Sequence, residues 1–153
     1  MQASAIELVP LDSKNSEVCE KFAAFVNRNY NSPLPVSARS LQREGQHYFW
    51  AQMKESREIV GATGFVQKTA KLAETVKTVI ALEFRGKGLG VILSQMIEDE
   101  VKRQGFKKVM TTIYITNLPM IFIKLKQGYR FEGFHPDHEA PGLHEYSLGK
   151  VFE

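Results

Sequence analysis

Alternating glycines are the most informative chemical feature of this sequence: Gly86, Gly88 and Gly90, within FRGKGLG. Glycine has no Cβ, so such a segment lets the backbone approach a ligand closely and adopt turns that other residues resist. A periodic helical pattern follows, and the first N–H groups of a helix are unpaired and lie at the positive end of its dipole. The pattern therefore predicts an anion site suited to a phosphate or pyrophosphate. Arg85 and Lys87 add positive charge to it.

The spacing of these residues excludes two common phosphate loops. A Walker loop needs Lys and then Ser or Thr after its last glycine, but Val91 and Ile92 follow Gly90. A dinucleotide fingerprint needs its third glycine at position 91, which is valine. What fits is Arg-x-x-Gly-x-Gly, with Arg85, Gly88 and Gly90 in register. The alternative is a glycine-rich helix start without a ligand.

Composition predicts one domain over residues 1–153. The chain is 43% hydrophobic and 24% charged, and it contains no linker, repeat or apolar run of membrane-spanning length. The N-terminus lacks the basic and apolar regions of a secretion signal. Cys19 is the only cysteine, so the chain cannot form an internal disulfide and suits a reducing, cytoplasmic compartment. The net charge of +3 is too small to indicate nucleic-acid binding by itself, although the pI is about 9.0.

Hydrophobic periodicity and turn residues predict an order of elements that positions the glycine segment between a strand and a helix. The expected elements are a strand at 5–9, helices at 18–30 and 37–44, strands at 47–53, 59–67 and 74–82, a helix from 89 to a C-cap at Gly105, a strand at 107–115, a helix at 117–127, and strands at 128–134 and 144–152.

This order, combined with two motifs, resembles the GNAT superfamily of acyl-CoA-dependent N-acyltransferases. The first motif is Arg85-x-x-Gly88-x-Gly90 on its strand-to-helix turn, and the second is Asn117 opening a helix before a Gly-aromatic pair that ends in Tyr129. The resemblance is most specific over residues 74–133. It implies a mixed α/β (α+β) fold, with a mostly antiparallel sheet of six to seven strands flanked by about four helices.

The resemblance implies acetyl-CoA as the cosubstrate and assigns its binding residues. The strand entering the loop would diverge from its neighbour after about Ile115, and a backbone N–H at about residues 79–81 would polarise the thioester carbonyl. The implied cofactor-binding residues are Val79, Ile80, Ala81, Leu82, Arg85, Gly86, Lys87, Gly88, Leu89, Gly90 and Asn117.

Catalytic groups follow from the same resemblance. An amine acceptor arrives as an ammonium and must lose a proton, and Glu74 lies where some members carry a glutamate base. A solvated strand-end carboxylate is the alternative for Glu74. Lys124 occupies the position at which many relatives have a tyrosine acid; it could hold the departing thiolate or be a solvated helix lysine. Tyr129 is a further candidate acid.

Other clusters carry weaker signals. The segment from His135 to Glu139, with His144 and Glu145 beyond it, contains metal-ligand residue types, but its prolines favour a loop, and we predict no metal site. That loop would border the acceptor, where Asp137 and Glu139 could attract a cation. The segment 31–46, with its two arginines, would form the opposite wall.

The sequence therefore predicts an enzyme that transfers the acetyl group of acetyl-CoA to a primary amine by direct attack. The acceptor, a small-molecule or peptide amine, is not identified by any motif. The alternative is a non-catalytic acyl-CoA-binding sensor on the same fold, and an RNA-binding protein has only the basic pI in its favour. Exposed strand edges at the C-terminal end would allow a homodimer.

Overall fold

The computed structural model describes all 153 residues. Its strands are β1 (Ile6–Pro10), β2 (Gln46–Met53), β3 (Ile59–Gln67), β4 (Leu72–Ile80), β5 (Lys108–Tyr114), β6 (Arg130–His135) and β7 (Glu145–Val151). Its helices are α1 (Ser16–Asn29), α2 (Ala38–Leu41), α3 (Leu89–Arg103) and α4 (Leu118–Lys126), with 3₁₀ turns at Ala3–Ala5 and Leu82–Phe84. The predicted order of strands and helices is confirmed. None of the helices is both long and apolar enough to span a bilayer.

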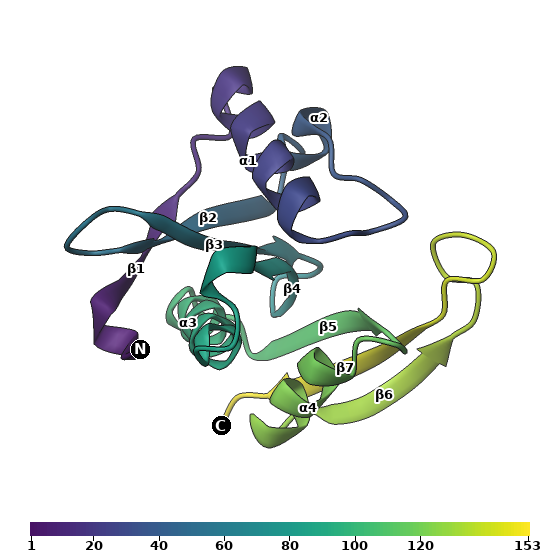
Figure 1. Cartoon of the computed structure of the whole chain (residues 1–153). Coiled ribbons are helices and arrows are strands. Elements are labelled where there is room, and N and C mark those ends of the chain that lie inside the picture. Colours follow the sequence, from purple (N-terminus) through teal and green to yellow (C-terminus); the bar gives the residue numbers. More distant parts are fainter.

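The strands form one sheet in the order β1-β2-β3-β4-β5-β7-β6. Every neighbouring pair is antiparallel except β4 and β5, which are parallel. Helices α1 and α2 lie on one face of the sheet, and α3 and α4 lie on the other (Figure 1). The predicted mixed α/β fold with a mostly antiparallel sheet is therefore confirmed.

The parallel pair in the middle of the sheet is joined at one end only. Backbone pairing of β4 with β5 covers Leu72 to Glu74, and Glu74 lies opposite Met110. Just beyond it, the Thr111 hydroxyl donates to the Thr75 carbonyl at 3.2 Å. The strands then separate, well before the expected point near Ile115. The sheet thus consists of two half-sheets, β1–β4 and β5-β7-β6, that diverge towards the C-terminal ends of β4 and β5 (Figure 1).

A bulge in β4 increases this early divergence. Ala62 lies opposite Val79 and Gly64 opposite Val76, so Lys77 and Thr78 together oppose a single residue of β3. Lys77 has a φ of 57°, in the left-handed region that a side chain resists. A bulge bends its strand, increases its twist and disrupts the ladder. Pairing with β5 ends at Glu74, just before the bulge, and the bend at the bulge carries β4 further from β5.

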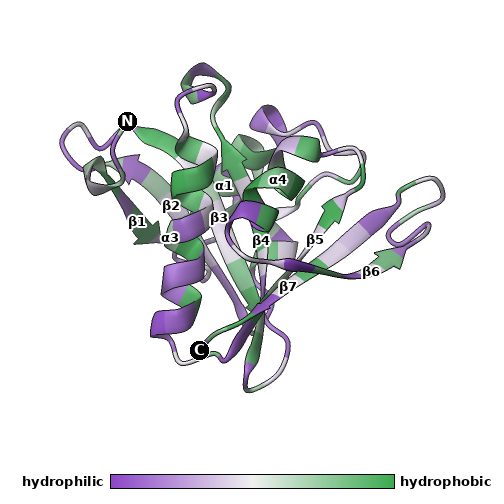
Figure 2. Cartoon of the chain, turned by 90° about the horizontal axis from the view of Figure 1, so that it is seen from below, coloured by the Kyte–Doolittle hydropathy of each residue, from purple (hydrophilic) through white to green (hydrophobic).

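Apolar side chains on both faces of the sheet fix the helices. Helix α1 packs with β2 and the end of β4 in one buried cluster that includes Phe22, Tyr48 and Val79. On the other face, α3 contributes Ile97 and Val101 to a cluster that also contains residues of β5, α4 and β7. Helix α3 has distinct polar and apolar surfaces, whereas α4 is largely apolar (Figure 2).

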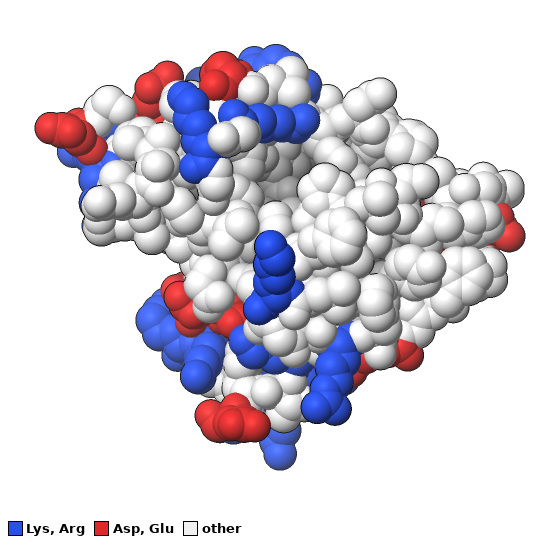
Figure 3. All heavy atoms as spheres, turned by 60° about the horizontal axis from the view of Figure 1, so that its bottom comes forward, with Lys and Arg blue, Asp and Glu red and all other residues white.

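Charged side chains are dispersed over the surface. The chain has 20 Lys and Arg against 17 Asp and Glu residues. On the face shown in Figure 3, Lys and Arg are scattered among acidic residues, with one basic side chain near the centre and a largely uncharged area to its right, instead of forming one continuous basic patch. This face therefore offers no extended electrostatic footprint for a nucleic acid.

Candidate active site

The glycine segment forms the turn between β4 and α3. Gly86 and Gly88 have φ values of 77° and 79°, and Gly88 is the N-cap of α3 in the left-handed conformation. Nothing lies within 4 Å of a Cβ built on either residue, so backbone conformation and not space makes glycine necessary there. Gly90 differs, because its Cβ would lie 3.4 Å from Ile123 of α4.

The backbone N–H groups of this turn are free. The first intrahelical donor of α3 is Ile92, whose N–H bonds to the Gly88 carbonyl at 3.3 Å. The N–H groups from Gly86 to Val91 make no backbone hydrogen bond. No acidic residue lies in the first turn of α3, and the exposed Lys87 ammonium lies 5.2 Å from the centre of the Phe84 ring. These donors, the helix dipole and the lysine together have the geometry and charge that a phosphate group requires, which makes the turn a candidate phosphate site.

The Arg85 guanidinium lies behind the turn and fastens it to two other elements. It donates to the Asn29 carbonyl at the end of α1 and, through Nε at 3.2 Å, to the Ile80 carbonyl. The buried Asn29 side chain accepts from the Leu82 N–H at 3.0 Å and donates to the Phe25 carbonyl at 2.9 Å. The sequence pattern missed Asn29, since it had no signal beyond its place near a helix end.

The end of β4 presents unpaired backbone to the gap between the half-sheets. The Ala81 N–H bonds to the Val60 carbonyl on β3 at 2.9 Å, and successive N–H groups of a strand point in opposite directions. The Ile80 N–H therefore points towards the β5 side, where β4 has no partner strand. Of the expected donors at 79–81, Ile80 is the one that the geometry leaves available.

Glu74 lies at the joined end of the two half-sheets. Its Oε1 accepts from the Thr112 hydroxyl at 3.1 Å, and its Oε2 lies 3.3 Å from the Lys68 ammonium. The side chain is 14% exposed, so it is largely removed from solvent. Both carboxylate oxygens thus have partners, and the carboxylate lies on the same face of the sheet as Thr112.

A cavity of about 390 Å³ opens beside the diverging ends of the half-sheets. Its walls come from the end of α1, the end of β5 and the loop between β6 and β7: Tyr30, Asn31, Pro33, Tyr114, Ile115, Thr116, Asn117, Gly142, Leu143 and His144. Asn117, expected beside the cofactor, lines this cavity and caps α4, where its Oδ1 accepts from the Met120 N–H at 3.4 Å. Of the segment 31–46, only Asn31 and Pro33 contribute; the two arginines do not.

A buried carboxylate, Glu145, lies next to this cavity. It opens β7 directly opposite Tyr114 on β5, and it is 4% exposed. Its Oε2 has no hydrogen-bond partner, and the nearest basic atom is His138 Nε2 at 3.9 Å. Burial and then the charge of Glu139 raise the pKa of Glu145 above its ordinary value. The sequence indicated Glu145 only as part of a cluster of metal-ligand residue types.

Lys124 is buried, which excludes the solvated helix lysine that the sequence left open. It is 2% exposed, and its ammonium lies 4.7 Å from the centre of the Tyr129 ring without a hydrogen-bond partner. Burial lowers the pKa of Lys124 to about 8, an effect that the charge of Glu98 opposes and that of Lys150 reinforces. Helix α4 is apolar on most sides, so periodicity alone could not orient this residue.

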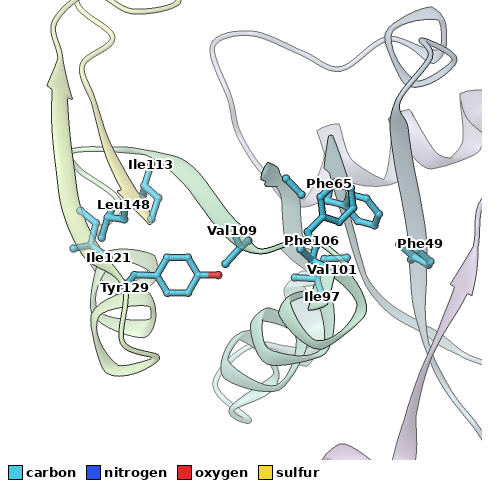
Figure 4. Packing of buried hydrophobic residues seen from close by; sticks show 11 residues of the cluster. Phe49, Phe65, Ile97, Val101, Phe106, Val109, Ile113, Ile121, Tyr129 and Leu148 are labelled. Atoms are coloured by element: carbon cyan, nitrogen blue, oxygen red, sulfur yellow. The ribbon is translucent and has the colours of Figure 1, made fainter. Parts of the chain in front are cut away.

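Tyr129 lies in the interior between the two half-sheets. Its ring is directed from the start of β6 towards Val109 and α3 (Figure 4). Its hydroxyl is buried without a hydrogen-bond partner, and burial, followed by the charge of Glu98, raises its pKa. A phenol with a raised pKa holds its proton more firmly, which disfavours Tyr129 as a proton donor.

The histidines near β6 and β7 are engaged in local contacts. His135 Nε2 lies 2.9 Å from the Ser147 hydroxyl, and His144 Nδ1 accepts from the Asp137 N–H at 3.1 Å. Asp137 in turn accepts from the Gly142 N–H at 2.6 Å, and the Glu139 carboxylate accepts from the Tyr114 hydroxyl at 2.9 Å. The loop is thus a hydrogen-bonded wall of the cavity.

Comparison with known proteins places this geometry in a family. The model of the Acetyltransferase (GNAT) family matches residues 16–129. Among solved structures, a mutant of the spermidine N-acetyltransferase SpeG from Vibrio cholerae has a TM-score of 0.77 at 16% identity, covering 97% of this chain and 94% of that one. The IAA acetyltransferase from Bacillus cereus has a TM-score of 0.72 at 16% identity, with 96% and 98% covered.

An acetyltransferase of the GNAT family from Streptococcus pneumoniae has a TM-score of 0.74 at 15% identity, covering 96% of this chain and 99% of that one. No curated protein matches the sequence significantly. At these identities the structural likeness shows the fold, and the family follows from the match over residues 16–129.

Proposed function

The chain belongs to the GNAT acetyltransferase family, and from this premise we propose that it transfers the acetyl group of acetyl-CoA to a primary amine by direct attack. The observation that carries the proposal is the run of free N–H groups from Gly86 to Val91, beside the unpaired end of β4. A pyrophosphate bound at the start of α3 would direct the rest of the cofactor into the gap between the half-sheets. Its thioester would then lie between Ile80 and β5.

Each step of the reaction has a candidate group in this chain. The Ile80 N–H would donate to the thioester oxygen as negative charge develops on it. Glu74 is a candidate acceptor for the ammonium proton, through water, from its position at the joined end of the half-sheets. Lys124, with a pKa of about 8, is matched to a thiol of pKa about 8.5, and it would stabilise or protonate the departing thiolate.

The proposal rests on acetyl-CoA binding, which calorimetry of the purified protein tests directly. We expect micromolar affinity for acetyl-CoA, about 8 kcal/mol, and none for ATP or NAD. A screen of amines for release of free CoA thiol then separates the enzyme from the non-catalytic sensor, which would bind acetyl-CoA without releasing thiol. Absence of acetyl-CoA binding would refute both.

The same proposal includes the class of acceptor, the assembly and the compartment. The similar structures include a spermidine N-acetyltransferase, and a polyamine is accordingly a rational first acceptor to assay. Strand β6 is an edge of the sheet and carries the exposed Phe131 and Phe134, which would favour a homodimer. Light scattering of the purified protein measures whether it forms this homodimer in solution. The buried free Cys19 accords with a reducing, cytoplasmic location.

A further inference from the structure

The cavity beside the gap combines aromatic walls with a buried acid. Tyr30 from the end of α1 and Tyr114 from the end of β5 line it. Glu145, paired with Tyr114 in the sheet, is 4% exposed and leaves Oε2 without a hydrogen-bond partner. An unpaired buried carboxylate costs stability, and a bound cation would remove that cost. The unpartnered Glu145 Oε2 therefore indicates a place for a positively charged ligand.

The charge of Glu145 acts on both walls of the cavity. After burial, the charge of Glu145 is the next cause that raises the pKa of Tyr30. Burial is also the main cause that raises the pKa of Tyr114 to about 12, and Glu145 contributes to it. The sheet itself places Glu145 directly behind the cavity wall, because it lies opposite Tyr114 and next in the chain to His144, and both of these residues line the cavity.

The other groups around Glu145 are mostly acidic or neutral. Glu139 of the loop and Glu74 of β4 raise its pKa, while His138 and the Thr112 side chain oppose them. His135 of β6 lies opposite Glu145 in the sheet, but its Nε2 is engaged with Ser147. The ionisable groups around Glu145 therefore carry excess negative charge, which favours an ammonium group beside it.

Resting on the acyl transfer proposed above, we infer that Glu145 binds the ammonium group of a small primary alkyl amine in this cavity and accepts its proton, while the rings of Tyr30 and Tyr114 flank the carbon chain. At about 30 Å³ per water molecule, the cavity has room for about 13 waters. That volume accepts a small amine or one lysine-like chain. Aromatic faces also attract an ammonium group.

Glu145 suits the role of ammonium ligand and proton acceptor better than Glu74, because Glu145 has a carboxylate oxygen without a hydrogen-bond partner. Glu74 has Thr112 on one oxygen and Lys68 on the other. Glu145 has a free oxygen and a raised pKa, which makes its carboxylate the better proton acceptor. Thr112 lies between the two acids, so Glu74 would position Thr112 and, through it, Glu145.

The proton balance of the step is complete. The ammonium gives one proton to the Glu145 carboxylate, and the resulting amine forms a C–N bond to the thioester carbon. The C–S bond then breaks, and the CoA thiolate takes the second proton that the nitrogen loses. Glu145 returns its proton to solvent on the side of the exposed His138, whose Nε2 lies 3.9 Å from Glu145 Oε2, and the products are the amide and free CoA thiol.

The test compares Glu145→Gln with Glu74→Gln and with the exposed control Glu20→Gln, using n-butylamine and hydroxylamine as acceptors. Butylamine is an ammonium at pH 7, whereas hydroxylamine is neutral. We expect Glu145→Gln to lower kcat/KM for butylamine about 100-fold or more, to remove the acidic limb of its pH profile, and to leave hydroxylamine within about threefold. Glu145→Asp should restore part of the butylamine rate, and Glu20→Gln should match the parent.

The outcomes separate the two proposals when acetyl-CoA affinity is measured on the same preparations. Absence of acetyl-CoA binding by the parent protein would overturn the acyl transfer itself. Acetyl-CoA binding without butylamine turnover by the parent would overturn the small-amine assignment. Equal losses for both acceptors in Glu145→Gln, or none for butylamine, would overturn the role of Glu145. Thermal unfolding of each variant checks that a lost rate is not lost structure.

Discussion

At the scale of single residues, the site depends on backbone conformation as much as on side-chain chemistry. Gly88 holds the left-handed conformation from which α3 begins, and the free N–H groups are arranged around it. Arg85, the basic residue of the motif, is directed to carbonyls behind the turn. The positive character of the phosphate site therefore comes mainly from backbone donors, the helix dipole and Lys87.

Gly88→Val tests the turn directly. A left-handed conformation costs a residue with a Cβ about 1–2 kcal/mol, so we expect the turn to rearrange and acetyl-CoA affinity to fall by about tenfold or more. Gly105→Val is the matched control, because Gly105 has a φ of 94°, nothing within 4 Å, and lies beyond the other end of α3. Calorimetry should show a similar loss of stability in both and a loss of affinity only in Gly88→Val. If Gly88→Val bound acetyl-CoA as tightly as Gly105→Val, the assignment of the turn as the phosphate site would be contradicted.

Lys124 predicts a specific dependence of stability on pH. Its folded-state pKa of about 8 lies below the ordinary 10.5, so the folded protein releases this proton at lower pH than the unfolded chain. Between pH 8 and pH 10.5 the unfolded chain binds more protons than the folded protein, so the free energy of unfolding rises with pH. Below about pH 8 the cost of burying the charged Lys124 ammonium is fully present. Because each unit of pKa difference corresponds to about 1.4 kcal/mol, the charged Lys124 lowers the free energy of unfolding by an amount on the order of 3 kcal/mol.

Lys124→Met should therefore be more stable than the parent at pH 7, and its advantage should shrink towards pH 10. Urea unfolding at both pH values measures this, with the exposed Lys126→Met on the same helix as the control. The same substitution should slow thiol release if Lys124 serves the departing thiolate. A stability gain that is independent of pH would show that the ammonium is not the cause.

At the scale of elements, the end of α1 and the phosphate turn form one unit. Asn29 holds the Leu82 N–H through its side chain, and Arg85 holds the Asn29 carbonyl. Tyr30, the next residue, lines the cavity beside the gap. The glycine turn and one wall of the cavity are thus fixed by the same helix end, although more than fifty positions separate Asn29 from Leu82 in the chain.

Asn29→Ala should break this link. The Leu82 N–H would lose its acceptor in a partly buried place, at a cost of about 1–3 kcal/mol, and acetyl-CoA affinity should fall with it. Asn27→Ala is the control on the same helix, since the Asn27 side chain exchanges two hydrogen bonds with Val36 on the surface instead. Denaturant unfolding and calorimetry measure both effects. If Asn29→Ala kept its acetyl-CoA affinity, the helix end would not support the turn.

At the scale of the whole molecule, the half-sheets are joined over Leu72 to Glu74 and open beyond. The buried cluster that contains Ile97 and Val101 of α3 also includes Ala73 and Val109 from that joint. A ligand in the gap would complete the backbone contacts that β4 and β5 do not make with each other. The open end is therefore the part of the sheet that a ligand should order most.

Hydrogen exchange with and without acetyl-CoA tests this. Saturation at about 100 times Kd should stabilise the fold by about 2.7 kcal/mol. Beyond that general effect, amides at 76–81 and 110–117 should become the most strongly protected, because both edges of the gap gain a neighbour. The β2–β3 pair is the internal control, since its strands are already paired from Gln46 to Gln52 and lie away from the gap. Protection on one side of the gap alone would contradict a ligand that bridges both half-sheets.

The sequence by itself determined the order of elements, the glycine turn before α3 and the family. These features are local: Gly86, Gly88 and the periodic pattern of α3 act through backbone conformation and helix geometry, which depend on neighbours in the chain. Only the tertiary structure decided the separation of β4 from β5 after Glu74, the bulge at Lys77 beyond it, the burial of Lys124 and the position of Glu145 opposite Tyr114. Bulge position, burial and electrostatic surroundings depend on residues distant in sequence, because packing against other elements sets them.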